Sequence, residues 1–123
     1  MIRRPPGVEV LLDGAATGGA FCLLRLVLEP AGEAGWHAHT REDETLVVVE
    51  GDLDVETEAG EQGLEPGEAA FLRRGVRHAF RAGQDGAHVL VFATPSGLED
   101  FFRALPDGVD PQAAADAAGL VLG

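Results

Sequence analysis

Three histidines and a glutamate have a spacing that predicts one metal site. His37 and His39 are separated by one residue, Glu44 follows five residues after His39, and His78 lies in a second apolar segment. Successive side chains of a β-strand point to opposite faces, so His37 and His39 share a face. Two imidazoles on one face and a carboxylate on the next strand can converge on one ion. His78 joins them where a closed barrel brings a distant strand alongside.

The predicted ligands define the chemistry of the site. Imidazole nitrogens with one carboxylate oxygen suit one divalent transition ion, namely iron, nickel, manganese, copper, cobalt or zinc. Four protein ligands leave a coordination position open, as catalytic sites do. Glu44 is the predicted carboxylate, as ligand or proton acceptor, because it shares a face with Leu46 and Val48 on an apolar strand. Glu42 and Asp43 remain alternatives to it.

The interior beside the ion is expected to be an apolar substrate pocket. Strand parity assigns to this pocket Leu46, Val48, Phe80 and Phe92, with Val91 as the alternative to Phe92. Trp36 alternates with His37 and is expected to face away from the pocket or to lie at the barrel rim. His88, the fourth histidine, is predicted not to be a ligand.

Composition limits the class of protein. The chain has 123 residues, enough for a single domain over 1–123, and 46% of them are hydrophobic. Nine basic against 21 acidic residues give a net charge of -12, which disfavours nucleic acid and anionic membranes as partners. Cys22 is the only cysteine, so no intrachain disulfide forms. With no predicted signal peptide or membrane span, we expect a cytoplasmic protein.

The spacing of glycines and prolines along the chain predicts an all-β fold. Seventeen glycines and seven prolines separate short apolar runs, as in sandwiches and barrels. We expect strands at 8–12, 20–28, 35–40, 44–49, 53–58, 69–72, 77–81 and 87–94. In the segment 52–58, apolar Leu53 and Val55 alternate with acidic residues, which predicts one solvated face.

The segment 20–28 is apolar on both faces except for Arg25, so we expect the C-terminal tail or a second subunit to cover it. A homodimer is therefore predicted, and Cys22 is predicted to be a buried apolar residue.

The C-terminal tail at about 97–119 is expected to be helical. Ser96 and Glu99 have the spacing of a capping box, and an apolar stripe that includes Phe101 and Phe102 is predicted to pack on the barrel. Asp110 followed by proline predicts the start of a second helix, which ends near Gly119.

These motifs together resemble the cupin superfamily, whose members are double-stranded β-helix, or jelly-roll, barrels. His37, His39, Glu44 and Gly51 fit its first motif, although Gly32 lies one position from the place of the leading glycine. Gly67, Gly75 and His78 fit the second motif, in which Arg73 and Ala82 replace a proline and an asparagine. The resemblance covers about 20–94 and implies that His37, His39, Glu44 and His78 are the metal ligands.

The resemblance leaves the reaction open, since one fold supports many chemistries. The tail further resembles small single-domain cupins described as quercetin-dioxygenase-like. The leading hypothesis is a metal-dependent dioxygenase acting on an aromatic or enol-type small molecule. A non-redox cyclase or isomerase of polyketide-like compounds and a metal-loaded binding module are the alternatives. The chain contains no tyrosine, which excludes a lyase that needs a tyrosine base.

Overall fold

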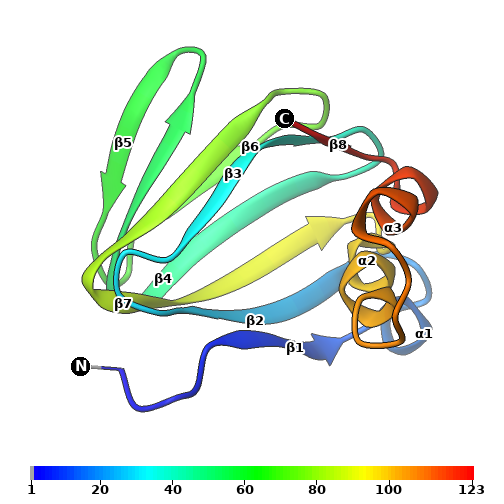
Figure 1. Ribbon diagram of the computed structural model, residues 1–123, viewed down its shortest axis with the longest axis horizontal. Coiled ribbons are helices and arrows are strands. Elements are labelled where there is room, and N and C mark those ends of the chain that lie inside the picture. The colour runs from blue at the N-terminus through cyan, green and yellow to red at the C-terminus, as the bar shows by residue number, and fades with distance from the viewer. Residues whose placement is uncertain (1) are drawn as a thin grey trace.

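The computed structural model describes residues 2–123; Met1, the first residue of the expected 1–123 domain, lies outside the described residues. The described chain is mainly antiparallel β-sheet, which confirms the predicted all-β, double-stranded β-helix fold with short C-terminal helices (Figure 1). Its strands are β1 (Gly7–Leu12), β2 (Cys22–Leu28), β3 (Glu33–His39), β4 (Asp43–Thr57), β5 (Gly60–Leu64), β6 (Ala69–Leu72), β7 (His78–Thr94) and β8 (Leu120–Leu122). Its helices are α1 (Gly14–Thr17), α2 (Leu98–Ala104) and α3 (Pro111–Ala118).

Two long strands, β4 and β7, build both layers of the barrel. They pair from Asp43 opposite Thr94 to Thr57 opposite His78, with two irregularities in between. Both bend near Gly51, where the register shifts, and so they pass from one layer to the other. Gly51 has a φ of 76°, and a Cβ there would overlap the carbonyl oxygen of Gly86. The bend therefore requires glycine at this position.

The bend explains why the expected strands differ from the observed ones. The segments 44–49 and 53–58 are parts of one strand, β4, and 77–81 and 87–94 are parts of β7. Antiparallel pairing continues through the irregularities that sequence patterning interprets as loops. Sequence patterning does not predict β5 or β8, because β5 is polar and glycine-rich and β8 has three residues.

The inward faces of the strands form one core. Leu53 and Val55 are buried, whereas Asp52, Asp54 and Glu56 are not, which confirms the predicted solvated face of this strand. Cys22 is fully buried and belongs to the core cluster.

The C-terminal helices lie together at one end of the barrel (Figure 1). The expected capping box does not form, because Gly97 is the N-cap of α2 and Glu99 accepts hydrogen bonds from the backbone N–H groups of Gly97 (2.6 Å) and Gly14 (2.8 Å). The predicted start of α3 is confirmed, since the Asp110 carboxylate accepts from the first turn. After Gly119, β8 pairs with β3 and brings the end of the chain to the mouth of the barrel.

Candidate metal centre and its pocket

Strand pairing places the histidines side by side. His37 and His39 lie on β3, and His37 is the register partner of His78 on β7. The ring centroids of His37 and His78 are 4.3 Å apart. Glu44, near the start of β4, pairs with Ala93 and so belongs to the opposite layer of the barrel. The four predicted ligands therefore converge from three strands.

The side chains form a compact cluster. One ring nitrogen from each of His37, His39 and His78 lies within 4.8 Å of the others. The Glu44 carboxylate oxygens lie 3.3 Å from His39 Nε2 and 3.5 Å from His78 Nε2. His39, Glu44 and His78 are buried and His37 is partly buried, on the side of the pocket. The cluster therefore has one face open to the pocket.

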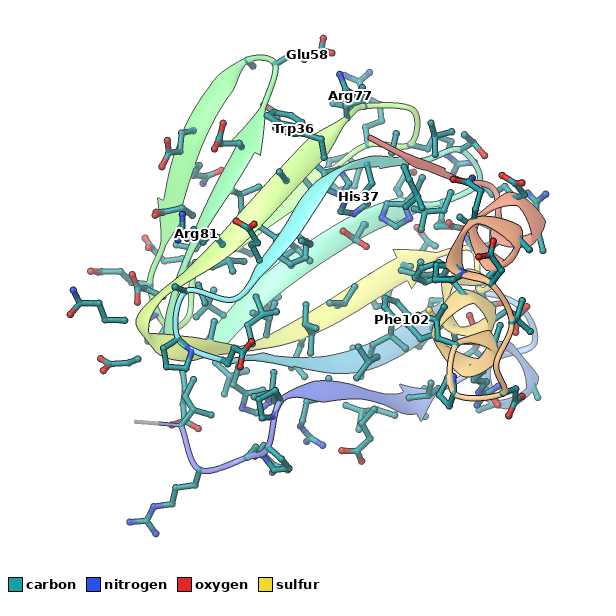
Figure 2. The ribbon with its side chains drawn as sticks, viewed as in Figure 1. Trp36, His37, Glu58, Arg77, Arg81 and Phe102 are labelled. Atoms are coloured by element: carbon teal, nitrogen blue, oxygen red, sulfur yellow. The ribbon has the colours of Figure 1, made fainter. Side chains whose placement is uncertain are left out.

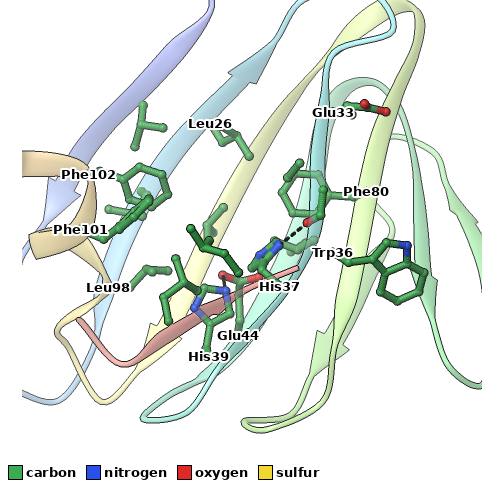
Figure 3. A pocket seen from close by; sticks show the side chains of 18 of the residues that line it. Leu26, Glu33, Trp36, His37, His39, Glu44, Phe80, Leu98, Phe101 and Phe102 are labelled. Atoms are coloured by element: carbon green, nitrogen blue, oxygen red, sulfur yellow. Dashed lines mark hydrogen bonds and ion pairs between the residues drawn. The ribbon is translucent and has the colours of Figure 1, made fainter. Parts of the chain in front are cut away.

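Backbone carbonyls orient two of the imidazoles. His37 Nδ1 lies 2.6 Å from the oxygen of Gly35, the contact drawn as a dashed line in Figure 3, and His78 Nδ1 lies 3.2 Å from the oxygen of Val76. A carbonyl oxygen can only accept, so each Nδ1 carries the hydrogen. The Nε2 lone pairs of both rings are then free for a ligand, as metal binding requires.

Burial and neighbouring groups shift the pKa values of His37 and Glu44 in the directions that metal binding requires. Burial lowers the pKa of His37 to about 4, against the opposing effect of its bond to Gly35, so its ring is neutral at neutral pH. Burial by itself raises the pKa of Glu44, but its contacts with His78, His39 and His37 outweigh burial and hold this pKa below its usual value. A neutral imidazole beside a carboxylate is the form that binds a divalent ion.

Unpartnered polar atoms show that the cluster suits a ligand. Within residues 2–123, both ring nitrogens of His39, Nε2 of His78 and Oε1 of Glu44 are buried without a hydrogen-bond partner. Such atoms are costly unless they are satisfied. Their chemistry, imidazole nitrogen and carboxylate oxygen, matches a divalent transition ion. The cluster is therefore compatible with metal binding.

A largely apolar pocket of about 540 Å³ opens over this cluster (Figure 3). Leu46 and Phe80, two of the four residues assigned to the pocket from strand parity, line it. Val48 lies deeper, within the core cluster, and does not line the pocket. Phe92 lies on the outer face, where it packs against Phe21, and Val91 occupies the pocket position instead. The reason is the irregular segment of β7 before residue 87, which moves the inward face from even-numbered to odd-numbered residues.

The far wall of the pocket comes from the C-terminal tail. Phe101 and Phe102 line it, with Leu98 beside them, and Phe102 also packs against the barrel core (Figure 3). Leu120 and Leu122 add the edge formed by β8. The helical spacing of the phenylalanines predicts that they pack on the barrel, but it does not show that this packing leaves a cavity. The run of three apolar residues after Gly119 is the signal in the sequence for β8.

Two aromatic or imidazole side chains lie apart from the cluster. Trp36 is among the residues that line the pocket, but its indole points away from the clustered histidines, and the Arg77 guanidinium lies 5.6 Å from its ring centroid (Figures 2 and 3). His88 accepts a hydrogen bond from Arg25 Nε at 3.1 Å and lies near Glu50, outside the cluster. His88 therefore does not join the three clustered histidines.

Comparison with known proteins identifies the family. Residues 24–94, more than half of the chain, match the sequence profile of the cupin domain, so the chain belongs to the cupin family. KdgF from Halomonas sp. is similar in structure, with 20% identity, a TM-score of 0.65, and coverage of 72% of this chain and 76% of that chain. The protein TT1209 from Thermus thermophilus has 28% identity and a TM-score of 0.59, over 63% of this chain and 74% of that one.

A third structure, BH2720 from Bacillus halodurans, has 16% identity and a TM-score of 0.68, over 76% of this chain and 73% of that chain. No curated protein matches this chain significantly. No helix in residues 2–123 is long and apolar enough to cross a membrane. The comparisons thus define the fold and the family, and the site must supply the argument for function.

Proposed function

We propose that this chain is a metal-dependent dioxygenase that acts on an aromatic or enol-type small molecule. The observation that carries the proposal is the opening of the cluster of His37, His39, Glu44 and His78 into an apolar pocket of about 540 Å³. In this proposal the four residues hold one divalent ion. Structural metal sites are closed by protein ligands, whereas this cluster faces a cavity large enough for a small organic molecule.

The pocket wall supports a flat and mainly apolar substrate. Phe80 faces the cluster from β7, and Phe101 and Phe102 face it from α2. Aromatic rings bind flat apolar groups through offset or edge-to-face contacts. The charged residues along this wall are Glu33 and Glu44, which are both acidic. Within the described residues, no lysine or arginine lines the pocket to bind a substrate carboxylate. Away from the proposed ion, the wall therefore favours uncharged parts of a substrate.

The residues of the site have distinct tasks in this reaction. When bound, a divalent transition ion supplies Lewis acidity and, for iron, nickel, copper or manganese, one-electron chemistry with dioxygen. Glu44 lines the pocket, and it is ionised at neutral pH because the pKa of its carboxyl lies below the usual value. In this proposal it can therefore accept a proton from a substrate hydroxyl. The apolar wall excludes water and so strengthens charge interactions at the cluster.

The first test is metal content, measured by mass spectrometry on untagged protein beside a His37→Ala control. We expect about one ion per chain in the wild type and a large loss in the variant. Dioxygen consumption is then measured with a panel of flavonols, catechols and β-diketones, on wild type and Glu44→Gln. Consumption that depends on substrate, and that falls in Glu44→Gln, is the expected result.

Other outcomes favour the alternatives. A zinc-containing protein that converts a compound to a product of unchanged mass without dioxygen would identify a cyclase or isomerase. Ligand-induced stabilisation without turnover would indicate a binding module. A protein that takes up no metal after reconstitution contradicts both enzymatic schemes.

We also propose that the protein is a cytoplasmic homodimer. Strand pairing aligns Phe71, Thr45, Phe92 and Leu23 in one uncharged row on the outer face of the sheet, and Phe71 is 66% exposed. Uncharged apolar faces of this kind are typical of subunit interfaces. Sedimentation of wild type and Phe71→Glu tests the proposal, with a dimer expected only for the wild type. The single buried cysteine suits a reducing compartment.

A further inference from the structure

His39 differs from the other two clustered histidines in what its second ring nitrogen faces. Nδ1 of His37 and Nδ1 of His78 face neutral backbone carbonyls. Nδ1 of His39 instead lies 3.6 Å from Oε1 of Glu42. On the opposite side of the same ring, Nε2 lies 3.3 Å from Glu44. The His39 imidazole is thus held between two carboxylates, of which only Glu44 is on the side of the cluster.

No stabilising ion pair with an arginine accounts for the burial of the Glu42 carboxylate within the described residues. Its side chain is only 2% exposed, and Oε1 has no hydrogen-bond partner within the described residues. In residues 2–123 no lysine or arginine forms an ion pair with it, and His39 is the partner that approaches. A carboxylate buried in this way costs free energy unless a donor satisfies it. The available donor is Nδ1–H of His39.

We propose that Glu42 is a positioning residue that accepts a hydrogen bond from Nδ1–H of His39 and directs Nε2 of this ring to the metal ion. The inference rests on the proposed metal site. The present separation of 3.6 Å is about 0.6 Å longer than a usual N–H···O bond, a gap that a small rotation of the Glu42 side chain closes. A carboxylate behind a ligating imidazole fixes its tautomer and makes the nitrogen a stronger ligand.

This arrangement separates the roles of the three consecutive acidic residues 42–44, where the chain enters β4. Glu44 faces Nε2 of His39 and Nε2 of His78, so it belongs to the cluster. Glu42 lies on the far side of the His39 ring and is not a ligand. Asp43 points outward, where its carboxylate pairs with Arg74 at 3.1 Å. Asp43 therefore provides a matched control, because it is the acidic residue next to Glu42 in the chain and its carboxylate pairs with Arg74 instead of the cluster.

The test compares Glu42→Gln, Glu42→Met and Asp43→Asn with the wild type. Zinc and cobalt affinities are measured by competition with a chelator, and the cobalt absorption spectrum is recorded. We expect both Glu42 variants to bind zinc about 10- to 100-fold more weakly, with an altered cobalt spectrum. Asp43→Asn should bind both ions as the wild type does. Thermal unfolding of the metal-free proteins should be unchanged or shifted upward in Glu42→Met, because the variant removes a buried charge.

A second measurement needs no metal. Nitrogen chemical shifts of the imidazoles in the metal-free protein, labelled with ¹⁵N-histidine, report the tautomer of each ring. We expect His39 to carry its hydrogen on Nδ1 in the wild type and in Glu42→Gln, whose amide oxygen still accepts. In Glu42→Met this tautomer should become mixed.

The outcomes separate this inference from the proposed function. Wild-type affinity for zinc in both Glu42 variants, with an unchanged His39 tautomer in Glu42→Met, would overturn the inference and leave the metal site intact. A wild-type protein that binds neither zinc nor cobalt refutes the proposed function and the role of Glu42 toward an ion. In that case, an unchanged His39 tautomer in Glu42→Met would also refute the proposed hydrogen bond between His39 and Glu42.

Discussion

Acid should destabilise the metal-free protein through His37. Burial lowers the pKa of this ring from its ordinary value of 6.5 to about 4. Between these two values the unfolded chain binds a proton that the folded chain does not bind. The sign is therefore fixed: the folded state has its full stability above about pH 6.5 and loses it as the pH falls toward 4.

The size of the loss follows from the two pKa values. Below both of them the shift corresponds to about 3 kcal/mol, of which about 2 kcal/mol is lost between pH 7 and pH 5. These are upper values, because solvent partly screens a ring that is not fully buried. Below pH 5 the lowered pKa of Glu44 adds a loss of the same sign.

Urea unfolding of chelator-treated protein at pH 7 and pH 5, for wild type and His37→Gln, measures this loss. Glutamine does not titrate, so the variant should lose about 2 kcal/mol less over this interval. The pKa of His88 is also lowered by burial, and its contribution is present in both proteins, so it cancels in the difference. Equal losses in wild type and variant would refute the assignment to His37.

Three further predictions concern the scaffold. Gly51→Ala should destabilise the protein by about 3 kcal/mol or more, because alanine is strained at a φ of 76° and its Cβ overlaps the Gly86 carbonyl; urea unfolding beside Gly60→Ala, where a Cβ has free space, separates overlap from strain. Leu46→Ala should lower the free energy of unfolding by about 2–5 kcal/mol, since Leu46 is 1% exposed. A decrease smaller than about 1 kcal/mol would show that the pocket floor relaxes around the shorter side chain. Cys22, whose pKa is raised to about 12 mainly by burial, should react with a thiol reagent only after unfolding, and rapid reaction of the native protein would contradict its burial.

The sequence alone determined the local parts of the site. The one-residue spacing places His37 and His39 on one face of any strand, because strand side chains alternate. Likewise, Glu44, Leu46 and Val48 share the inward face of β4, as their parity predicts. The start of α3 was also predictable, since its cap depends on Asp110 and Pro111 alone.

Tertiary structure decided which distant groups meet. The bends in β4 and β7 depend on register shifts, and across this irregular region the inward face of each strand changes between even-numbered and odd-numbered residues. Even-numbered residues of β7 point inward at Phe80, but odd-numbered ones do so at Val91, which is why parity favoured Phe92. The contact of Glu42 with His39 likewise depends on the path of the turn that precedes β4. Whether the helix that carries Phe101 and Phe102 fills the barrel mouth or leaves a pocket depends on packing distances, which hydrophobic spacing does not encode.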